Sequence, residues 1–195
     1  MTTQVSGHHK KGITIYDIAV TALFAALCYV ATYFLRIEIP TPLGRMMIHG
    51  GNIVCLLSAL LMGPLRGAAA DAIGMGLFDL LSGWASSAPS TIVMRFCMGQ
   101  ASGEGPKLSG KKDNPGIGWA IAGAAAGMVT YYVLYLGYSF LSDLILGNGL
   151  AAVLADVATK AVTSGSTGIV SIIVASLLYL PFHKALAAAG YYRKR

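Results

Sequence analysis

The sequence predicts an all-α membrane protein, folded as a bundle of six membrane-spanning helices with both termini in the cytoplasm. Hydrophobic residues make up 55% of the chain and charged residues only 11%, whereas an ordinary soluble domain has about 25% charged residues. Apolar runs close to the roughly 20 residues that a helix needs to cross a bilayer recur along the chain. The 24 glycines suit helices that pack in lipid through small residues.

The positive charges predict the orientation of the bundle. The chain has 14 Lys and Arg against 8 Asp and Glu. With six crossings, one set of cations falls on a single side: Lys10, Lys11, Arg66, Lys107, Lys111, Lys112, Lys184, Arg193, Lys194 and Arg195. By the positive-inside rule that side is the cytoplasm. We therefore expect a multi-pass protein of a prokaryotic plasma membrane and no binding to nucleic acid. Its expected parts are a cytoplasmic tail at 1–12, one six-helix membrane domain at 13–190 and a basic cytoplasmic tail at 191–195.

The first predicted span covers about 15–35. Ala19, Ala22 and Ala26 lie at i, i+3 and i+7 and so form a smooth strip on one helix face. This strip either packs inside the bundle or docks another membrane protein. The connection at 36–48 is expected on the outside, where its turn-forming residues could close over a pocket as a lid.

Four further segments follow in order. The second span, at 49–62, and the fourth, at 89–99, are short for a full crossing. The third span is expected at 64–81. After a cytoplasmic loop at 101–116, the fifth span runs over about 117–146.

The last part of the chain contains a packing motif and an unusually long apolar segment. Gly123 and Gly127 form a GxxxG strip, which favours close helix contact. The segment 150–189 is too long for one straight crossing. We therefore expect an amphipathic lead-in on the outer side at 151–160 and the crossing itself at 165–180.

No catalytic or metal site is expected. The run GPKLSGKK at 105–112 resembles a phosphate-binding P-loop, but it ends in Lys instead of Ser or Thr and no strand precedes it. The chain has no H-E-x-x-H and no G-x-S-x-G. Cys28, Cys55 and Cys97 lie in apolar runs without metal-type spacing and are expected to be free thiols.

Charged residues inside the predicted spans mark candidate functional positions, because an ionisable group in hydrocarbon is costly without a role or a partner. Asp71, Asp79 and Arg95 are of this kind. Arg95 either pairs with one of the two aspartates or faces a ligand. Asp79, nearer the outer end of its span, is the better ligand candidate.

A second set of polar residues shares one face of the last segment. Asp156, Lys160 and Ser164 lie at i, i+4 and i+8. They form either a local ion pair at the outer surface or one wall of a pocket. Such a pocket would hold a small polar aromatic molecule together with residues of the middle stretch: Asn52, Asp79 and Trp84.

The middle stretch also carries a family resemblance. Its motifs are IHGGN at 48–52, LLMGPLRG at 60–67, FDLLSGW at 78–84 and APST at 88–91. They resemble the substrate-binding S components of energy-coupling factor (ECF) vitamin transporters. Within that family they are most similar to the branch that handles riboflavin, hydroxymethylpyrimidine or pyridoxine.

The resemblance implies a subunit that captures a B-type vitamin or precursor from outside and delivers it through a membrane coupling subunit and two ATPases. The subunit itself would need no cofactor, since ATP is used by its partners. The family's AxxxA pattern, matched at Ala22 and Ala26, implies docking on the coupling subunit through the strip that includes Ala19. The implied substrate-binding residues are Arg45, His49, Asn52, Asp79, Trp84, Lys160 and Ser164.

Two other classes of function stay open at this point, and so does the identity of the vitamin. The segment DVATK at 156–160 departs from the Pro- and Asn-containing pattern of the family. An intramembrane enzyme acting on a lipid or peptide is one alternative, and a structural membrane-assembly protein is the other.

Overall fold

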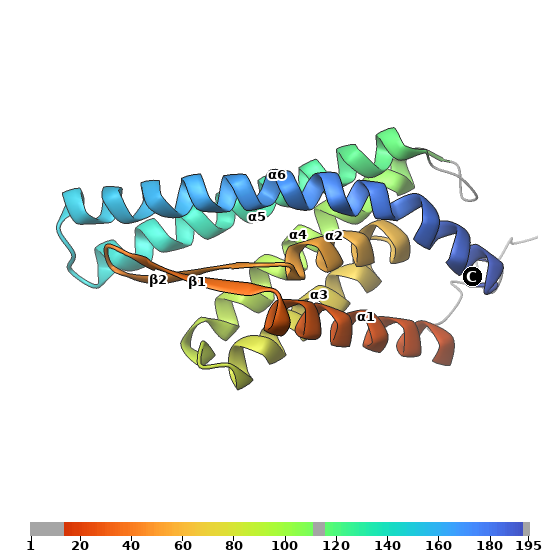
Figure 1. Ribbon diagram of the computed structural model, residues 1–195, viewed down its shortest axis with the longest axis horizontal. Helices are drawn as coiled ribbons and strands as arrows, with labels where there is room; N and C mark the ends of the chain where they lie inside the picture. Colours follow the sequence, from red (N-terminus) through yellow and green to blue (C-terminus); the bar gives the residue numbers. More distant parts are fainter. Residues whose placement is uncertain (1–13, 111–115, 193–195) are drawn as a thin grey trace, which may run out of the picture.

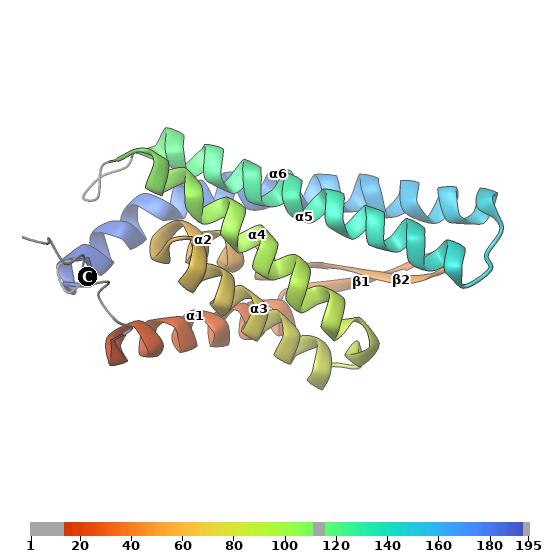
Figure 2. The same ribbon diagram turned by 180° about the vertical axis from the view of Figure 1, so that it is seen from behind.

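The computed structural model describes residues 14–110 and 116–192. Its elements are α1 (Ile15–Phe34), β1 (Arg36–Thr41), β2 (Gly44–His49), α2 (Gly51–Met62), α3 (Pro64–Leu81), the 3-10 turn η1 (Ala85–Ser87), α4 (Ala88–Leu108), α5 (Ile117–Ile145) and α6 (Leu150–Ala188). Figure 1 shows α5 and α6 side by side along the long axis, with the β1–β2 hairpin running beneath them. The tip of the hairpin lies at the end where α5 connects to α6, and Figure 2 shows the same arrangement from behind.

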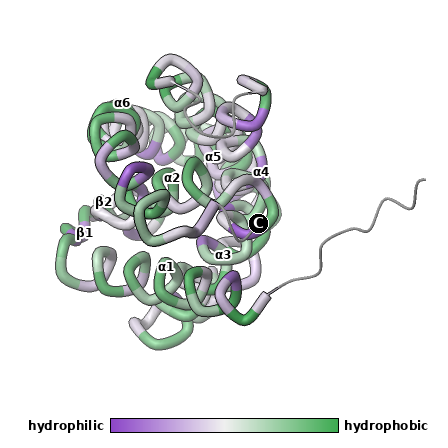
Figure 3. Tube along the Cα trace, turned by 90° about the vertical axis from the view of Figure 1, so that its right-hand side faces the viewer, coloured by the Kyte–Doolittle hydropathy of each residue, from purple (hydrophilic) through white to green (hydrophobic). Residues whose placement is uncertain are grey.

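The outer surface of the bundle is apolar. Among the described residues, three helices are long and apolar enough to cross a membrane: α1, α5 and α6. The α2 helix is apolar but has only 12 residues. Hydrophobic side chains such as Leu23 and Ile169 are exposed, at 58% and 62%, and the tube of α1 and α6 is mostly coloured hydrophobic in Figure 3. These features fit a membrane protein, as the sequence predicted.

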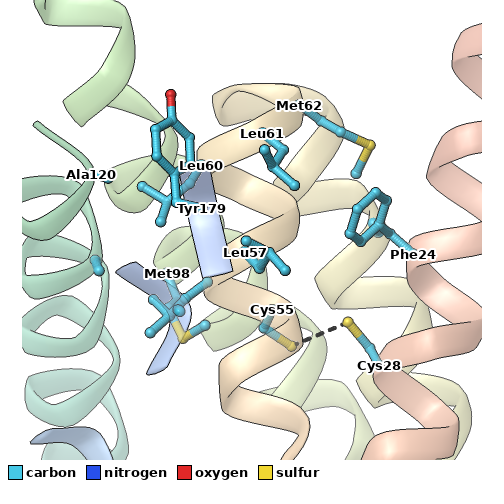
Figure 4. Close-up of a cluster of buried hydrophobic side chains, with 14 of the residues drawn as sticks. Phe24, Cys28, Cys55, Leu57, Leu60, Leu61, Met62, Met98, Ala120 and Tyr179 are labelled. Atoms are coloured by element: carbon cyan, nitrogen blue, oxygen red, sulfur yellow. Dashed lines mark hydrogen bonds between the residues drawn. The ribbon is translucent and has the colours of Figure 1, made fainter. Parts of the chain in front are cut away.

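The short α2 helix is the centre of the core. Every residue from Cys55 to Met62 is buried, which explains how so short an apolar segment is accommodated. Side chains of α2 meet Phe24 and Cys28 of α1 on one side and Met98 of α4 on the other (Figure 4). The Cys55 thiol donates a hydrogen bond to Cys28 Sγ at 3.5 Å, and both cysteines are free thiols.

Close backbone contact joins α4 to α5, as the GxxxG motif predicted. A Cβ atom built on Gly123 would lie 2.4 Å from the carbonyl oxygen of Ser102, and one built on Gly127 would lie 2.7 Å from the Ser102 side chain. Any larger residue at either position would force the two helices apart.

The connection between α1 and α2 is a β-hairpin, whereas the sequence predicted an all-α fold. Strands β1 and β2 pair antiparallel, with Arg36 opposite His49 and Thr41 opposite Gly44. β-branched residues at Ile37 and Ile39 favour an extended backbone. The β2 strand of this hairpin lies across the end of the bundle.

The predicted cytoplasmic loop at 101–116 was wrong over its first half. The α4 helix continues through this stretch to Leu108. Ser102, Gly103 and Pro106 are buried there, because small residues let α4 pack against its neighbours. The P-loop-like run therefore begins inside a helix, while residues 111–115 lie outside the described part of the chain.

The lead-in predicted at 151–160 is not a separate element, since it is continuous with the rest of α6 in one helix of 39 residues, and its position outside the membrane stays a prediction. Its hydroxyl side chains return hydrogen bonds to carbonyls four residues earlier, as Thr159 does to Ala155 and Thr163 does to Thr159. These bonds satisfy the polar groups within the helix. The polar composition of the first turns therefore did not mark a boundary.

The end of the chain folds back on the bundle. Tyr191 is 1% exposed, and the Tyr192 hydroxyl donates to the carbonyl of Leu61 at 3.2 Å. The stretch assigned to a basic tail thus begins with two packed tyrosines. The expected tail at 1–12 and the cations at 193–195 lie outside the described residues.

Candidate ligand-binding pocket

A polar pocket of about 200 Å³ opens at the hairpin end of the bundle. Strand β2, the turn after α3, η1 and the helices from α2 to α6 all contribute to its wall. The lining residues are Arg45, Met46, Met47, His49, Asn52, Met75, Asp79, Trp84, Ser87, Thr91, Arg95, Tyr131, Tyr135, Tyr138, Ser139, Ser142, Asp143, Lys160, Ser164 and Thr167.

The structure brings all the predicted binding residues to this one pocket. Their positions run from β2 and α2, through α3 and its following turn, to α6: Arg45, His49, Asn52, Asp79, Trp84, Lys160 and Ser164. Residues more than a hundred positions apart in the sequence thus share one wall. This is the geometry that a binding site requires, and a ligand contact at each position remains a prediction.

Arg95 on α4 is the most deeply buried charge in the pocket, at 1% exposed. Its Nη1 donates to Asn52 Oδ1 at 2.6 Å, and its Nη2 lies 3.3 Å from His49 Nε2. The guanidinium also lies 4.0 Å from the ring centre of Tyr131, a cation–π distance. Three elements are therefore tied to one cation at the base of the pocket.

The contact with Arg95 fixes the state of His49. A guanidinium can only donate hydrogen bonds, so Nε2 of the imidazole must accept. The ring is then neutral, with its proton on Nδ1. His49 contributes an acceptor to Arg95 and no charge to the pocket.

Of the two alternatives for Arg95, pairing with an aspartate is not what the structure contains. Within the described residues, no carboxylate lies within 4.0 Å of its guanidinium. Asp71 instead accepts hydrogen bonds from the Ser58 hydroxyl and, at 3.9 Å, from the Cys28 thiol. The direct hydrogen-bond partners of Arg95 are thus neutral side chains.

A second polar cluster surrounds Lys160 on α6. Its Nζ lies 2.5 Å from Asp156 Oδ2 and 3.9 Å from Asp143 Oδ2. It also donates to the Ser139 hydroxyl at 2.6 Å. The ion pair of Lys160 with Asp156 exists, but it is buried and not at the surface, because the two side chains are 14% and 0% exposed, and Lys160 also lines the pocket.

Beyond the contact of His49 with Arg95 at its base, the hairpin is attached to the rest of the pocket at two further points. The backbone N–H of Leu43, at the hairpin tip, donates to Asp156 Oδ1 at 3.1 Å. On the other side, Arg45 Nη2 donates to the carbonyl of Gly83 at 3.0 Å, and its guanidinium lies 4.3 Å from the Trp84 ring. These contacts hold β2 over the pocket.

Sequence reasoning missed the wall that α5 provides. Tyr131, Tyr135 and Tyr138 line the pocket, and the first two rings are stacked at 5.7 Å with an angle of 7°. Their spacing at i, i+4 and i+7 was a signal for one helix face. Ser142 and Asp143 extend the same face.

One buried cluster has ligand types that could hold a metal ion. Cys28, Cys55 and Asp71 place one ligand atom each within 4.8 Å of one another, all fully buried. Hydrogen bonds already join these groups to each other and to Ser58. The geometry is equally that of a satisfied polar cluster in a helix core.

The predicted docking strip on α1 faces outward. Ala19, Ala22 and Ala26 are all exposed, next to exposed apolar residues such as Leu23 and Leu27. The strip is therefore not used for packing within the described chain. Its use by another protein remains a prediction.

A bundle that is apolar outside and closes a hairpin over a polar pocket at one end defines a membrane-embedded ligand-binding protein. Comparison with protein families gives its kind: the model described as ECF-type riboflavin transporter, S component, matches residues 12–187. The chain belongs to this family, as its middle motifs indicated. S components are the substrate-binding subunits of transporters.

Comparison with solved structures agrees on the fold. The chain is similar to ThiT from Listeria monocytogenes, with a TM-score of 0.61, and the match covers 87% of this chain and 94% of that one. The two sequences are 20% identical, so this similarity is evidence for the fold alone. The search of curated proteins gave no match.

Proposed function

We propose that the protein is the substrate-specific subunit of an ECF-type importer that captures a B-type vitamin or precursor from outside the cell. The observation that carries this proposal is the convergence of the family-motif residues and α6 residues on one pocket beneath the hairpin. The ligand then passes through a membrane coupling subunit driven by two ATPases. The protein itself has no catalytic role and needs no cofactor, and it crosses a prokaryotic plasma membrane six times with both termini inside.

The chemistry of the pocket suits a compact heteroaromatic ring. Stacked rings at Tyr131 and Tyr135 offer a flat apolar face, and Arg95, Asp79 and Lys160 offer hydrogen bonds of both kinds. A cavity of about 200 Å³ lies below the usual 300–1,000 Å³ of pockets for drug-sized ligands. These features favour a single-ring pyrimidine or pyridine over a tricyclic flavin.

Entry of the ligand requires the hairpin to lift. Beyond His49 at its base, the hairpin is held by the Leu43–Asp156 hydrogen bond and by the contacts of Arg45 with Gly83 and Trp84. Each can be exchanged for hydrogen bonds to water at small net cost. The hairpin is therefore suited to act as a lid.

Docking on the coupling subunit is assigned to α1. The exposed strip of Ala19, Ala22 and Ala26 would let a partner helix approach closely, as small residues do in membrane helix pairs. The strip lies on a different helix from any residue that lines the pocket. Ligand binding and docking are therefore separable by mutation.

The first test is native mass spectrometry of the detergent-purified protein, followed by titration with vitamins and their precursors. We expect one pyrimidine- or pyridine-type molecule per chain, with binding weakened by Asp79→Ala. Leu80→Ala, at an exposed neighbouring position, is the control. A chain that binds no member of the panel would contradict the proposal and favour the enzyme or assembly functions.

A further inference from the structure

A second cavity, of about 540 Å³, lies at the end of the molecule opposite the hairpin tip. It is formed where the α2–α3 turn, the end of α4 and the last third of α6 meet. Its lining residues are Leu60, Leu61, Met62, Gly63, Pro64, Leu65, Arg66, Gly103, Pro106, Lys107, Gly110, Tyr179, His183 and Tyr192. We call it the α2–α4–α6 cavity. It shares no lining residue with the vitamin pocket.

One polar group inside the cavity lacks a partner. Tyr179 is 1% exposed, and its hydroxyl has no hydrogen-bond partner among the residues that the structure describes. Figure 4 shows this hydroxyl pointing away from the buried leucine and sulfur side chains around it. A buried hydroxyl without a partner costs free energy, so an acceptor on a bound molecule would stabilise it.

The rest of the cavity has an apolar wall and a rim that carries two cations. Leu60, Leu61 and Met62 are at most 3% exposed, and Leu65 at the rim is 62% exposed. Two cations stand beside this wall. The Lys107 side chain is 62% exposed in a surface pair with Glu104, and Arg66 is paired with the buried Asp17.

This combination selects one kind of occupant. An apolar wall opening at the end of a membrane bundle accepts an acyl chain, while the cations and the Tyr179 hydroxyl match a phosphate. Cations at the membrane boundary attract anionic lipid headgroups, and Lys107 and Arg66 both line this cavity. We propose that the α2–α4–α6 cavity binds one anionic phospholipid.

The bound lipid has a defined orientation. Its phosphate accepts a hydrogen bond from the Tyr179 hydroxyl and faces Lys107, while one acyl chain lies along Leu60 and Leu65. Arg66 remains with Asp17, so Lys107 is the cation that faces the phosphate. The lipid is then a structural component at the junction of three helices.

Native mass spectrometry of delipidated protein, given equal amounts of phosphatidylglycerol and phosphatidylcholine with the same acyl chains, tests the proposal. We expect one retained phosphatidylglycerol, with affinity reduced roughly fivefold by Lys107→Gln and by a similar factor by Tyr179→Phe. Lys184→Gln is the matched control, because Lys184 is exposed on α6 near the same end but does not line the cavity.

Three results would overturn the proposal. Equal retention of the two lipids would show that the cavity does not select for headgroup charge. An equal loss of lipid in Lys184→Gln would show that surface cations attract the lipid without a specific site. A third is that Tyr179→Phe leaves lipid retention unchanged but weakens binding of the purified coupling subunit, which would assign the cavity to a protein partner. Thermal unfolding of each variant shows that it is folded, so that a loss of lipid reports on the cavity.

Discussion

The pocket beneath the hairpin buries charged and polar side chains, whereas the outward face of α1 exposes apolar ones. Inside the pocket, Arg95 is 1% exposed and held by neutral polar partners, whereas on α1 Ile18 and Leu23 are 60% and 58% exposed. A soluble protein would be stabilised by the reverse arrangement. Under the proposed function, recognition of a small molecule and contact with another membrane protein belong to separate surfaces, so each can be altered alone.

The largest expected effect separates these two surfaces. Ala22→Leu combined with Ala26→Leu should abolish vitamin uptake by cells while leaving ligand affinity unchanged, because bulky residues would hold a partner helix away from α1. Uptake of labelled ligand and titration of the purified protein measure the two effects. Ala122→Leu with Ala126→Leu, at the same spacing on the exposed face of α5, should change neither. Normal uptake in the α1 variant would disprove docking there.

Next in size is the loss of the buried cation. Arg95→Met should weaken ligand binding by roughly 100-fold, since a hydrogen bond to a charged group contributes about 1.5–3 kcal/mol. It should also lower the unfolding temperature, because Asn52 and His49 lose their partner. Calorimetric titration and thermal unfolding measure these changes. An unaltered affinity would show that Arg95 is purely structural.

Removal of the second cation should have a smaller effect. Lys160→Met should reduce affinity by roughly tenfold, as expected for one hydrogen bond from a charged donor. Asp156 would still accept from Leu43, so the hairpin should stay attached. Lys184→Met, on the exposed surface of the same helix, is the control for the substitution. An equal decrease in both variants would mean that Lys160 acts only through overall charge.

The smallest effect concerns the lid. Arg45→Ala should speed ligand release by about threefold, because the contacts that it loses are half-exposed and such pairs contribute about 0.2–1 kcal/mol. Glu38→Gln removes the ion pair with Arg45 but keeps the bond to Gly83. Stopped-flow dissociation should therefore show a change in the first variant and little in the second. Equal rates in all three proteins would exclude Arg45 as a lid contact.

The bounds of the long apolar helices could be predicted from the hydropathy of the sequence alone. The first span, expected at 15–35, is Ile15–Phe34, and the fifth, expected at 117–146, is Ile117–Ile145. The errors fall where small or hydroxylated residues are satisfied by packing or by hydrogen bonds within a helix. The end of α4 was therefore predicted as a loop, and the start of α6 was not recognised as continuous with the crossing.

The pocket was predictable where the family motifs and a polar helix face marked it, and not elsewhere. Tyr131 and Tyr135 lie outside those motifs, so only the fold brings them to the site. The partners of Arg95 were missed for a different reason. Charge balance suggests a carboxylate, whereas the fold supplies Asn52 and His49.

The length of α6 has a consequence for where a ligand first meets the protein. A helix of 39 residues spans about 58 Å at 1.5 Å per residue, nearly twice the roughly 30 Å of hydrocarbon in a bilayer. Part of this rod must stand clear of the lipid or lean steeply through it. Under the proposed orientation, the N-terminal turns of α6 lie above the hydrocarbon, and Lys160 and the hairpin stand in water. A water-soluble ligand would then reach the pocket without entering the lipid.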